Sequence, residues 1–243
     1  ILTQSMSDFE LLICDDGSSP EAAALLNHLA EMDSRIRLIR RGNSFSLPSK
    51  LNACLEEARG TYIARMDDDD YAYPLRFEKQ LAYLDCHPEI SFVGSNVTLI
   101  RGGKPAGKRC LPPSPEVRDF YMTQPFIHPT LLFRREALEA ANAYSEDRHC
   151  LLCEDYDLLL RLYTAGYKGA NLQDVLLDYT IPLTAKGKRK MSHRWNEVVT
   201  RYRRFGDLNL LPQAWPYVIK PLVVGLLPEK LLYQLKKRRN RGG

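Results

Sequence analysis

Short apolar runs alternate with amphipathic stretches through the first 110 residues. The runs FELLIC (9–14), IRLIR (36–40), TYIARM (61–66) and ISFVGSNVTLI (90–100) predict strands, and the unbroken FELLIC predicts a strand covered on both faces. The intervening stretches predict three helices. Ser19 and Pro20 begin the first, over 20–32; Gly60 ends the second, over 47–60; and Pro74 begins the third, over 74–87. Strands and helices in alternation predict an α/β fold with a mostly parallel central sheet and flanking helices.

The second half of the chain has a less regular pattern. TLLFR (130–134) predicts a strand followed by a short helix, and EDYDLLLRLYTAG (154–166) predicts a longer helix. After Lys186 the pattern is helical and basic to the end. We therefore expect one α/β unit over 1–185 and a basic helical extension over 186–243. The first residues, ILTQSMSD (1–8), are typical of the tail of a helix.

Composition excludes several classes of protein. A chain of 243 residues with 26% charged side chains and ordinary glycine and proline content is neither collagen-like nor disordered. No apolar run approaches the roughly 18 residues of a membrane span, and the first residues lack the pattern of a signal peptide. The six cysteines lack the spacing of a disulfide framework or of a four-ligand zinc site, since Cys150 and Cys153 have no second pair. We expect a soluble, cytoplasmic protein with reduced thiols.

Charge is distributed unevenly along the chain. Residues 186–243 hold 15 basic and three acidic side chains, whereas residues 1–185 have a net charge of −8. A basic end indicates an anionic partner, either nucleic acid or lipid. The final run KKRRNRGG has no aromatic residue for base stacking, which argues against nucleic acid. In PEKLLYQLKKRRNR (228–241), three leucines share a helical face beside the cations, so we expect peripheral attachment to the inner face of the cytoplasmic membrane.

Four consecutive aspartates, Asp67 to Asp70, directly follow a predicted strand. Adjacent carboxylates repel one another unless a cation neutralises them. In an extended chain, alternate side chains share a face, so Asp67 and Asp69 are expected to converge on one ion. Oxygen ligands favour Mg²⁺ or Mn²⁺. The alternative is a solvated acidic turn that caps the helix beginning at Pro74.

Two further acidic pairs are candidates for binding or catalysis. Asp15 and Asp16 follow the first strand, at the strand end where open α/β sheets bind ligands, and Asp16 is placed to accept hydrogen bonds from a base or ribose. The alternative is an ordinary Asx turn. Glu154 and Asp155 begin a helix, where a carboxylate is stabilised as the anion. The pair is a candidate base, although taken alone it is better explained by simple helix stabilisation. His128, in the apolar stretch QPFIHPTLLF, is typical of a structural histidine.

In order, four stretches resemble the family-2 glycosyltransferases of bacterial cell-surface polysaccharide synthesis. They are SDFELLICDDGSS (7–19), RGTYIARMDDDDYAYPLRFEKQLAYLDCHPEISFVGSN (59–96), FIHPTLLFRREAL (126–138) and CEDYDLLLRLYTAGY (153–167). The resemblance implies a GT-A fold, a nucleotide-diphosphate-sugar donor (UDP-sugar favoured) and a saccharide or lipid-linked acceptor. The implied reaction is an inverting, metal-dependent transfer of a hexosyl or N-acetylhexosaminyl group.

The resemblance also assigns roles to residues. Asp16, with Asp15, matches the acidic position that contacts the nucleotide base. Asp67 and Asp69 match the outer positions of the DxD motif that holds the metal, and Asp68 matches the position between them, beside the donor. Asp155 matches the proposed catalytic base, and Glu154 a supporting neighbour.

The chain departs from the family in three respects. Asp68 fills a position that is often small in relatives. The family begins with a further strand, so we expect the first sheet position to be empty here. Pro182 stands where many relatives have a histidine, and this leaves His193 as a candidate substitute ligand. A non-catalytic GT-A-like subunit and a metal-dependent nucleotidyltransferase are the alternative functions. The first would be consistent with the empty position, and the second would need a glycine-rich basic loop before the first visible strand.

Overall fold

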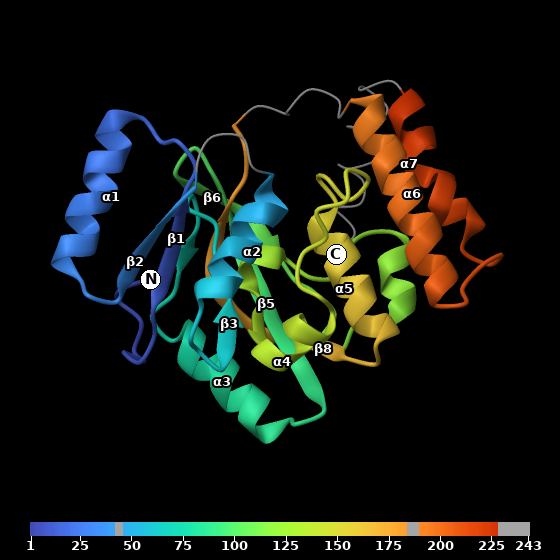
Figure 1. Cartoon of the computed structure of the whole chain (residues 1–243). Helices are drawn as coiled ribbons and strands as arrows, with labels where there is room; N and C mark the ends of the chain where they lie inside the picture. Colours follow the sequence, from blue (N-terminus) through green and yellow to red (C-terminus); the bar gives the residue numbers. More distant parts are fainter. Residues whose placement is uncertain (42–45, 184–189, 228–243) are drawn as a thin grey trace.

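The computed structural model describes residues 1–41, 46–183 and 190–227, and Figure 1 shows them as a curved sheet flanked by helices. The strands are β1 (Leu11–Asp15), β2 (Ile36–Arg40), β3 (Tyr62–Ala64), β4 (Tyr71–Ala72), β5 (Ile90–Arg101), β6 (Lys104–Arg109), β7 (Leu132–Arg134) and β8 (Lys168–Thr180). The helices are α1 (Pro20–Met32), α2 (Leu47–Glu57), α3 (Arg76–Cys86), α4 (Arg135–Ala140), α5 (Glu154–Thr164), α6 (Met191–Asp207) and α7 (Trp215–Leu226), with short 3-10 turns at Val117–Tyr121 and His128–Thr130.

The predicted elements are present, with shifted ends. Helix α1 starts at Pro20, and the Ser19 hydroxyl accepts a hydrogen bond from the backbone N–H of Ala22 at 3.3 Å. Helix α2 ends at Glu57, three residues before Gly60. The expectation of a helix tail in residues 1–8 was wrong, because this segment is held instead by tertiary contacts: the Gln4 side chain donates to the Tyr73 carbonyl at 2.7 Å.

The expectation of a mostly parallel sheet was also wrong in detail. Strands β1 and β2 form a parallel pair, separate in hydrogen bonding from a six-stranded sheet of order β3-β7-β5-β8-β4 with β6 paired to β5. In the described chain only that pair and the long β5–β8 pair are parallel, and four pairs are antiparallel. The α/β architecture is confirmed. The antiparallel strands are short or belong to hairpins, which alternation alone does not reveal.

The β5–β6 hairpin has a specific local cause. Gly102 and Gly103 form its turn with φ of 58° and 73°, a left-handed conformation that glycine adopts without strain. Paired glycines between two strand-forming runs are a hairpin signal. The hairpin carries Arg109, at the end of β6, toward the site described below.

The two faces of the six-stranded sheet pack against different helices. Successive side chains of a strand point to opposite faces, and in β5 Phe92 joins the larger core while Val93 joins a smaller one. The smaller core includes Leu84 of α3, and the larger includes leucines of α5 together with Phe205 and Val218 of the C-terminal helices. The strand covered on both faces is therefore β5, which is buried over 91–97, and not FELLIC, since no side chain from Leu11 to Cys14 is buried.

Helix α2 connects the separate β1–β2 pair to the rest of the molecule. On one side, Lys50 forms an ion pair with Asp16 at the end of β1. On the other, Asn52 makes reciprocal hydrogen bonds of 2.9 Å with the backbone N–H and carbonyl of Tyr144. Leu51 and Leu55 pack against the larger core.

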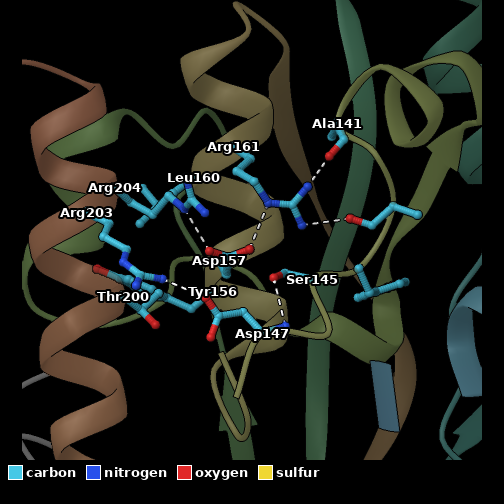
Figure 2. A network of polar contacts seen from close by, with 12 residues as sticks. Ala141, Ser145, Asp147, Tyr156, Asp157, Leu160, Arg161, Thr200, Arg203 and Arg204 are labelled. Atoms are coloured by element: carbon cyan, nitrogen blue, oxygen red, sulfur yellow. Dashed lines mark hydrogen bonds and ion pairs between the residues drawn. The ribbon is translucent and has the colours of Figure 1, made fainter. Parts of the chain in front are cut away.

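A buried carboxylate joins α5 to α6. Figure 2 shows Asp157 between two arginines, with Oδ2 2.7 Å from Arg161 Nε and Oδ1 2.7 Å from Arg204 Nε. Only 1% of the Asp157 side chain is exposed. Arg161 also donates to the carbonyls of Ala141 and Ala143, so one carboxylate organises the helix, its neighbour and the loop after α4.

All six cysteines lie in the described ranges and are unpaired there. In the described ranges, no helix combines the length and apolar character that a membrane span requires. The predicted amphipathic segment 228–241 lies outside the described residues, as does the boundary at 185/186.

Replacing Asp157 tests the α5–α6 junction. Asp157→Ala leaves two arginines without their shared carboxylate, so we expect a loss of about 3 kcal/mol in the free energy of unfolding, measured by urea denaturation. Asp207→Ala removes a more exposed partner of Arg204 and should cost under about 1 kcal/mol. Equal losses in the two variants would contradict a special role for Asp157.

Candidate active site

The acidic turn between β3 and β4 brings three carboxylates together. One oxygen atom from each of Asp67, Asp69 and Asp70 lies within 4.8 Å of the others. The turn is tied to the end of β8, because Thr180 donates its backbone N–H to Asp70 Oδ1 at 2.8 Å and its hydroxyl to the Asp69 carbonyl at 2.5 Å. The convergence of Asp67 and Asp69 expected from the sequence is therefore present, with Asp70 as a third member.

Asp70 is the most perturbed of these carboxyl groups. Burial, followed by repulsion from Asp67 and Asp69, raises its pKa to about 6. Its second oxygen, Oδ2, is buried and has no hydrogen-bond partner among the described residues. A buried carboxylate oxygen without a donor, beside two more carboxylates, fits a divalent cation that prefers oxygen ligands.

Asp68, to which the resemblance gave a place beside the donor, points elsewhere. Its side chain is exposed and is not among the three whose oxygen atoms converge. Its role at the donor stays a prediction, with Asp70 better placed in the described structure. His193 lies in the first turn of α6 and does not join the acidic cluster.

A cavity of about 290 Å³ extends from the acidic turn toward the start of α5. The residues that line it come from the ends of β3, β6 and β8, from 123–129 and from the starts of α2 and α5: Leu47, Arg65, Asp67, Arg109, Thr123, Gln124, Phe126, Ile127, His128, Pro129, Glu154, Asp155 and Tyr179. The cavity thus brings the first aspartate of the acidic turn and the acidic pair of α5 to one space.

Both residues of that pair line the cavity. Glu154 is 8% exposed, and burial together with Asp155 raises its pKa. Asp155 is half-buried, and its Oδ1 accepts the backbone N–H of Tyr156 at 2.7 Å, as expected for a carboxylate in the first turn of a helix.

Arg65 supplies positive charge beside the acidic turn. Its guanidinium is largely buried and forms an ion pair with Asp67. Residues 65 and 67 alternate along an extended chain, so this pairing follows from strand geometry that our sequence analysis did not apply to an arginine. Arg109 and Tyr179 were missed for a different reason: they reach the cavity through the pairing of β5 with β6 and β8, which the sequence does not specify.

His128 occupies the wall of the cavity as a neutral side chain. Burial, reinforced by the charge of Arg65, holds its pKa well below the usual range. Its Nε2 lies 2.9 Å from the Tyr144 hydroxyl. This hydrogen-bond partner agrees with the interpretation of His128 as a structural histidine. His128 also lines the cavity, so it would contact a ligand bound there.

The Asp15–Asp16 pair lies outside the described lining of this cavity. Asp15 Oδ1 accepts the backbone N–H of Ser18 at 3.0 Å, which is the Asx turn that the sequence left open. This hydrogen bonding lowers the pKa of Asp15. Asp16 pairs with Lys50, and its Oδ1 is buried without a partner in the described chain. Of the two, Asp16 retains the capacity to accept a hydrogen bond from a ligand.

The fold is of the GT-A type. The structure is similar to TarS 1–349 of S. aureus in complex with UDP-GlcNAc, with a TM-score of 0.66, 16% identity, and coverage of 90% of this chain and 66% of that one. It is also similar to the mannosyltransferase PcManGT of Pyrobaculum calidifontis in complex with GDP-Man and Mn²⁺, with a TM-score of 0.55, 15% identity, and coverage of 98% and 73%.

Sequence comparison identifies the family. The profile for glycosyl transferase family 2 matches residues 1–140. EpsE of Bacillus subtilis (strain 168) is 32% identical over 240 residues, covering 98% of this chain and 86% of EpsE. The amylovoran biosynthesis glycosyltransferase AmsE of Erwinia amylovora is 29% identical over 247 residues, covering 98% and 90%. The chain belongs to glycosyl transferase family 2, as the resemblance implied.

The raised pKa of Glu154 predicts a dependence of stability on pH. A carboxyl group with a raised pKa in the folded state contributes stability below its ordinary pKa, and this contribution is lost as the pH rises through the folded value. Glu154→Gln should therefore become more stable relative to the parent between about pH 4 and pH 7, as measured by urea denaturation. The exposed Glu136→Gln is the control. If the free energies of unfolding of Glu154→Gln and the parent differed by the same amount at pH 4 and at pH 7, the raised pKa of a buried Glu154 would be contradicted.

Proposed function

We propose that this glycosyltransferase moves a hexosyl or N-acetylhexosaminyl group from a nucleotide-diphosphate sugar to a hydroxyl of a saccharide or lipid-linked acceptor, with inversion. The observation that carries the proposal is the cavity that brings Asp67 of the acidic turn together with Glu154 and Asp155. A donor diphosphate needs charge compensation at one end of such a space, and an acceptor hydroxyl needs a base at the other.

The acidic turn is the proposed metal site of the enzyme. Asp67, Asp69 and Asp70 would hold Mn²⁺ or Mg²⁺, and the fit rests on their converging oxygens and on the unpartnered Oδ2 of Asp70. A bound divalent ion would offset negative charge on the departing diphosphate. Arg65, beside Asp67, is placed to add positive charge at the same end of the cavity.

Asp155 is the proposed base at the opposite end. Its carboxylate would take the proton of the acceptor hydroxyl while that oxygen forms a bond to the anomeric carbon. The bond from the anomeric carbon to the phosphate oxygen breaks at the same time, and its electron pair leaves with the nucleotide diphosphate. Attack from the face opposite the leaving group inverts the anomeric centre. Glu154 would support the base electrostatically, with Asp16 contacting the nucleotide base as the family motif implies.

The relatives support the proposed substrate classes. TarS was solved with UDP-GlcNAc and PcManGT with GDP-Man and Mn²⁺. The names of AmsE and of the O-antigen biosynthesis glycosyltransferase WbnJ of Escherichia coli refer to polysaccharide synthesis. We favour a UDP-sugar as donor. We also propose that the enzyme works at the inner face of the cytoplasmic membrane, which the basic residues 186–243 support through their attraction to anionic lipid.

Donor binding should depend on the cation through the acidic turn. Asp69→Ala should reduce the Mn²⁺-dependent affinity for UDP, measured by isothermal titration calorimetry, by about tenfold or more, because a carboxylate ligand is lost. Asp68→Ala is the matched comparison: the Asp68 side chain is exposed outside the cluster, so its loss of affinity should be clearly smaller. The metal site would lie elsewhere if Asp69→Ala bound UDP as tightly as Asp68→Ala did.

Catalysis should depend on a proton acceptor at the start of α5. Asp155→Asn keeps the size and most hydrogen bonding of the side chain but takes no proton, so we expect transfer to fall by about 10²–10⁴-fold with donor affinity retained. Transfer, donor hydrolysis and donor binding are measured on the same protein. Because both acidic residues line the cavity, Glu154→Gln is assayed beside Asp155→Asn, and a larger loss in that variant would reassign the base to Glu154.

A further inference from the structure

The outer side of the α6–α7 pair is unusually apolar for an exposed surface. Seven large hydrophobic side chains on these helices are each at least 46% exposed: Met191, Trp195 and Tyr202 on α6, and Trp215, Ile219, Val223 and Leu226 on α7. We call this set the α6–α7 face. It contains both tryptophans of the chain. Exposed apolar groups gathered on one surface indicate an interaction site, whereas singly scattered ones do not.

The seven side chains form one surface. On α7, the four residues are spaced by four, four and three positions, which places them along one side of the helix. The opposite side is covered, since Val218 and Pro221 are buried. At one end of the pair the rings of Tyr202 and Trp215 lie 5.7 Å apart. At the other, a Cβ on Gly225 would lie 3.2 Å from Met191 Cε, so the two helices are in close contact there as well.

These contacts show that α6 and α7 run antiparallel, side by side at the edge of the molecule in Figure 1. The start of α6 and the end of α7 therefore lie at the same end of the pair. In the sequence, Lys186, Lys188, Arg189 and Lys190 precede α6, and six more basic residues follow α7. Residues 186–243 carry a net charge of +12.

Exposed aromatic and aliphatic side chains, in a segment of the chain with a strongly positive net charge, match the surface of an anionic bilayer. Tryptophan and tyrosine suit the boundary between headgroups and acyl chains, and cations attract anionic lipid. A second copy of this chain is a poorer match, because each copy carries the positive charge of residues 186–243 and like charges oppose association. The charge therefore favours lipid over self-association.

We infer that the α6–α7 face lies in the interfacial layer of an anionic membrane. The inference deepens the proposed function, on which it rests for its biological meaning, by assigning the membrane contact to described residues outside 228–243. The face is also connected to the active-site cavity. On the covered side of α7, Tyr217 stacks on Tyr121 with ring centroids 4.7 Å apart, and Lys220 donates to the Met122 carbonyl. Thr123 and Gln124, the next residues, line the cavity.

This connection indicates the class of acceptor. Residues 121–124 join the membrane-facing helix directly to one wall of the cavity. An acceptor hydroxyl carried on a lipid in the bilayer would approach the cavity past this segment. The α6–α7 face thus favours a lipid-linked saccharide as acceptor over one free in solution.

The two tryptophans make the inference directly measurable. Full-length protein is mixed with vesicles of phosphatidylglycerol and phosphatidylcholine, or of phosphatidylcholine alone, and tryptophan emission and co-sedimentation are recorded. We expect a blue shift of the emission and binding with the anionic vesicles. Trp195→Phe and Trp215→Phe each leave one reporter, and each should still shift. Emission that stays unchanged while the protein sediments with the vesicles would overturn the inference, because another surface would then be in contact.

A double variant tests the energetic contribution of the face. Ile219→Ser with Val223→Ser should lower the vesicle partition coefficient by about tenfold or more, since each apolar side chain would lose its burial in lipid. The matched control, Leu25→Ser with Met32→Ser, changes two exposed apolar residues of α1 and should bind as the parent does. Binding of the α7 variant equal to that of the control would contradict the inference. So would a parent that is dimeric in sedimentation velocity while the α7 variant is monomeric, since a second copy would then cover the face.

Failure of the proposed function would be visible separately. Vesicle binding requires no donor and no turnover. If the protein binds anionic vesicles through this face but transfers no sugar, the membrane inference holds and the proposed transferase function is contradicted. The α7 variant should conversely hydrolyse donor in solution at the parent rate.

Discussion

Two fully buried polar side chains of α3 fix the strands behind the active site. Arg76 donates to the carbonyl of Arg65 at 2.8 Å, where β3 gives way to the acidic turn. One turn later, Gln80 donates to the carbonyls of Val93 at 2.9 Å and Thr130 at 2.7 Å, in β5 and in the segment before β7. Buried polar groups are tolerable only when satisfied, so these bonds admit little displacement of the three segments. The position of the acidic turn depends on this anchoring.

The same anchoring shapes the charge of the site. Burial lowers the pKa of Arg76 to about 9, and the carboxylate of Asp70 opposes that shift. Arg65, just before the acidic turn, has its own carboxylate partner, Asp67. Positive groups thus stand behind and beside the acidic turn, while the oxygens of Asp67, Asp69 and Asp70 face one another. The carboxylates are held together at a cost in repulsion that cationic neighbours reduce only in part, and this is the electrostatic setting in which a divalent ion binds well.

Local signals allowed much of the fold to be predicted from the sequence. Ser19 and Pro20 marked the start of α1, and the apolar runs marked most strands, because caps and periodicity act over a few residues. Strand direction was not accessible, since the antiparallel pairing of β7 with β3 and β5 depends on contacts distant in sequence. For the same reason Asp67, Glu154 and Asp155 were found from the sequence, but Arg109 and Tyr179 were not. Asp70 was overlooked because side-chain alternation selected Asp67 and Asp69, whereas a turn brings the third carboxylate inward.

The separation of β1–β2 from the larger sheet has a consequence for local unfolding. No strand-to-strand hydrogen bond of the described chain joins the two sheets, and α2 with the first ten residues provides the main connections. A two-stranded element is marginally stable without such support. Amide hydrogens of β1 and β2 should accordingly exchange through partial openings that leave β5 and β8 protected. The region that contains Asp16 would then be the part of the enzyme with the lowest free energy of local opening. A ligand bound there would stabilise that region against such opening.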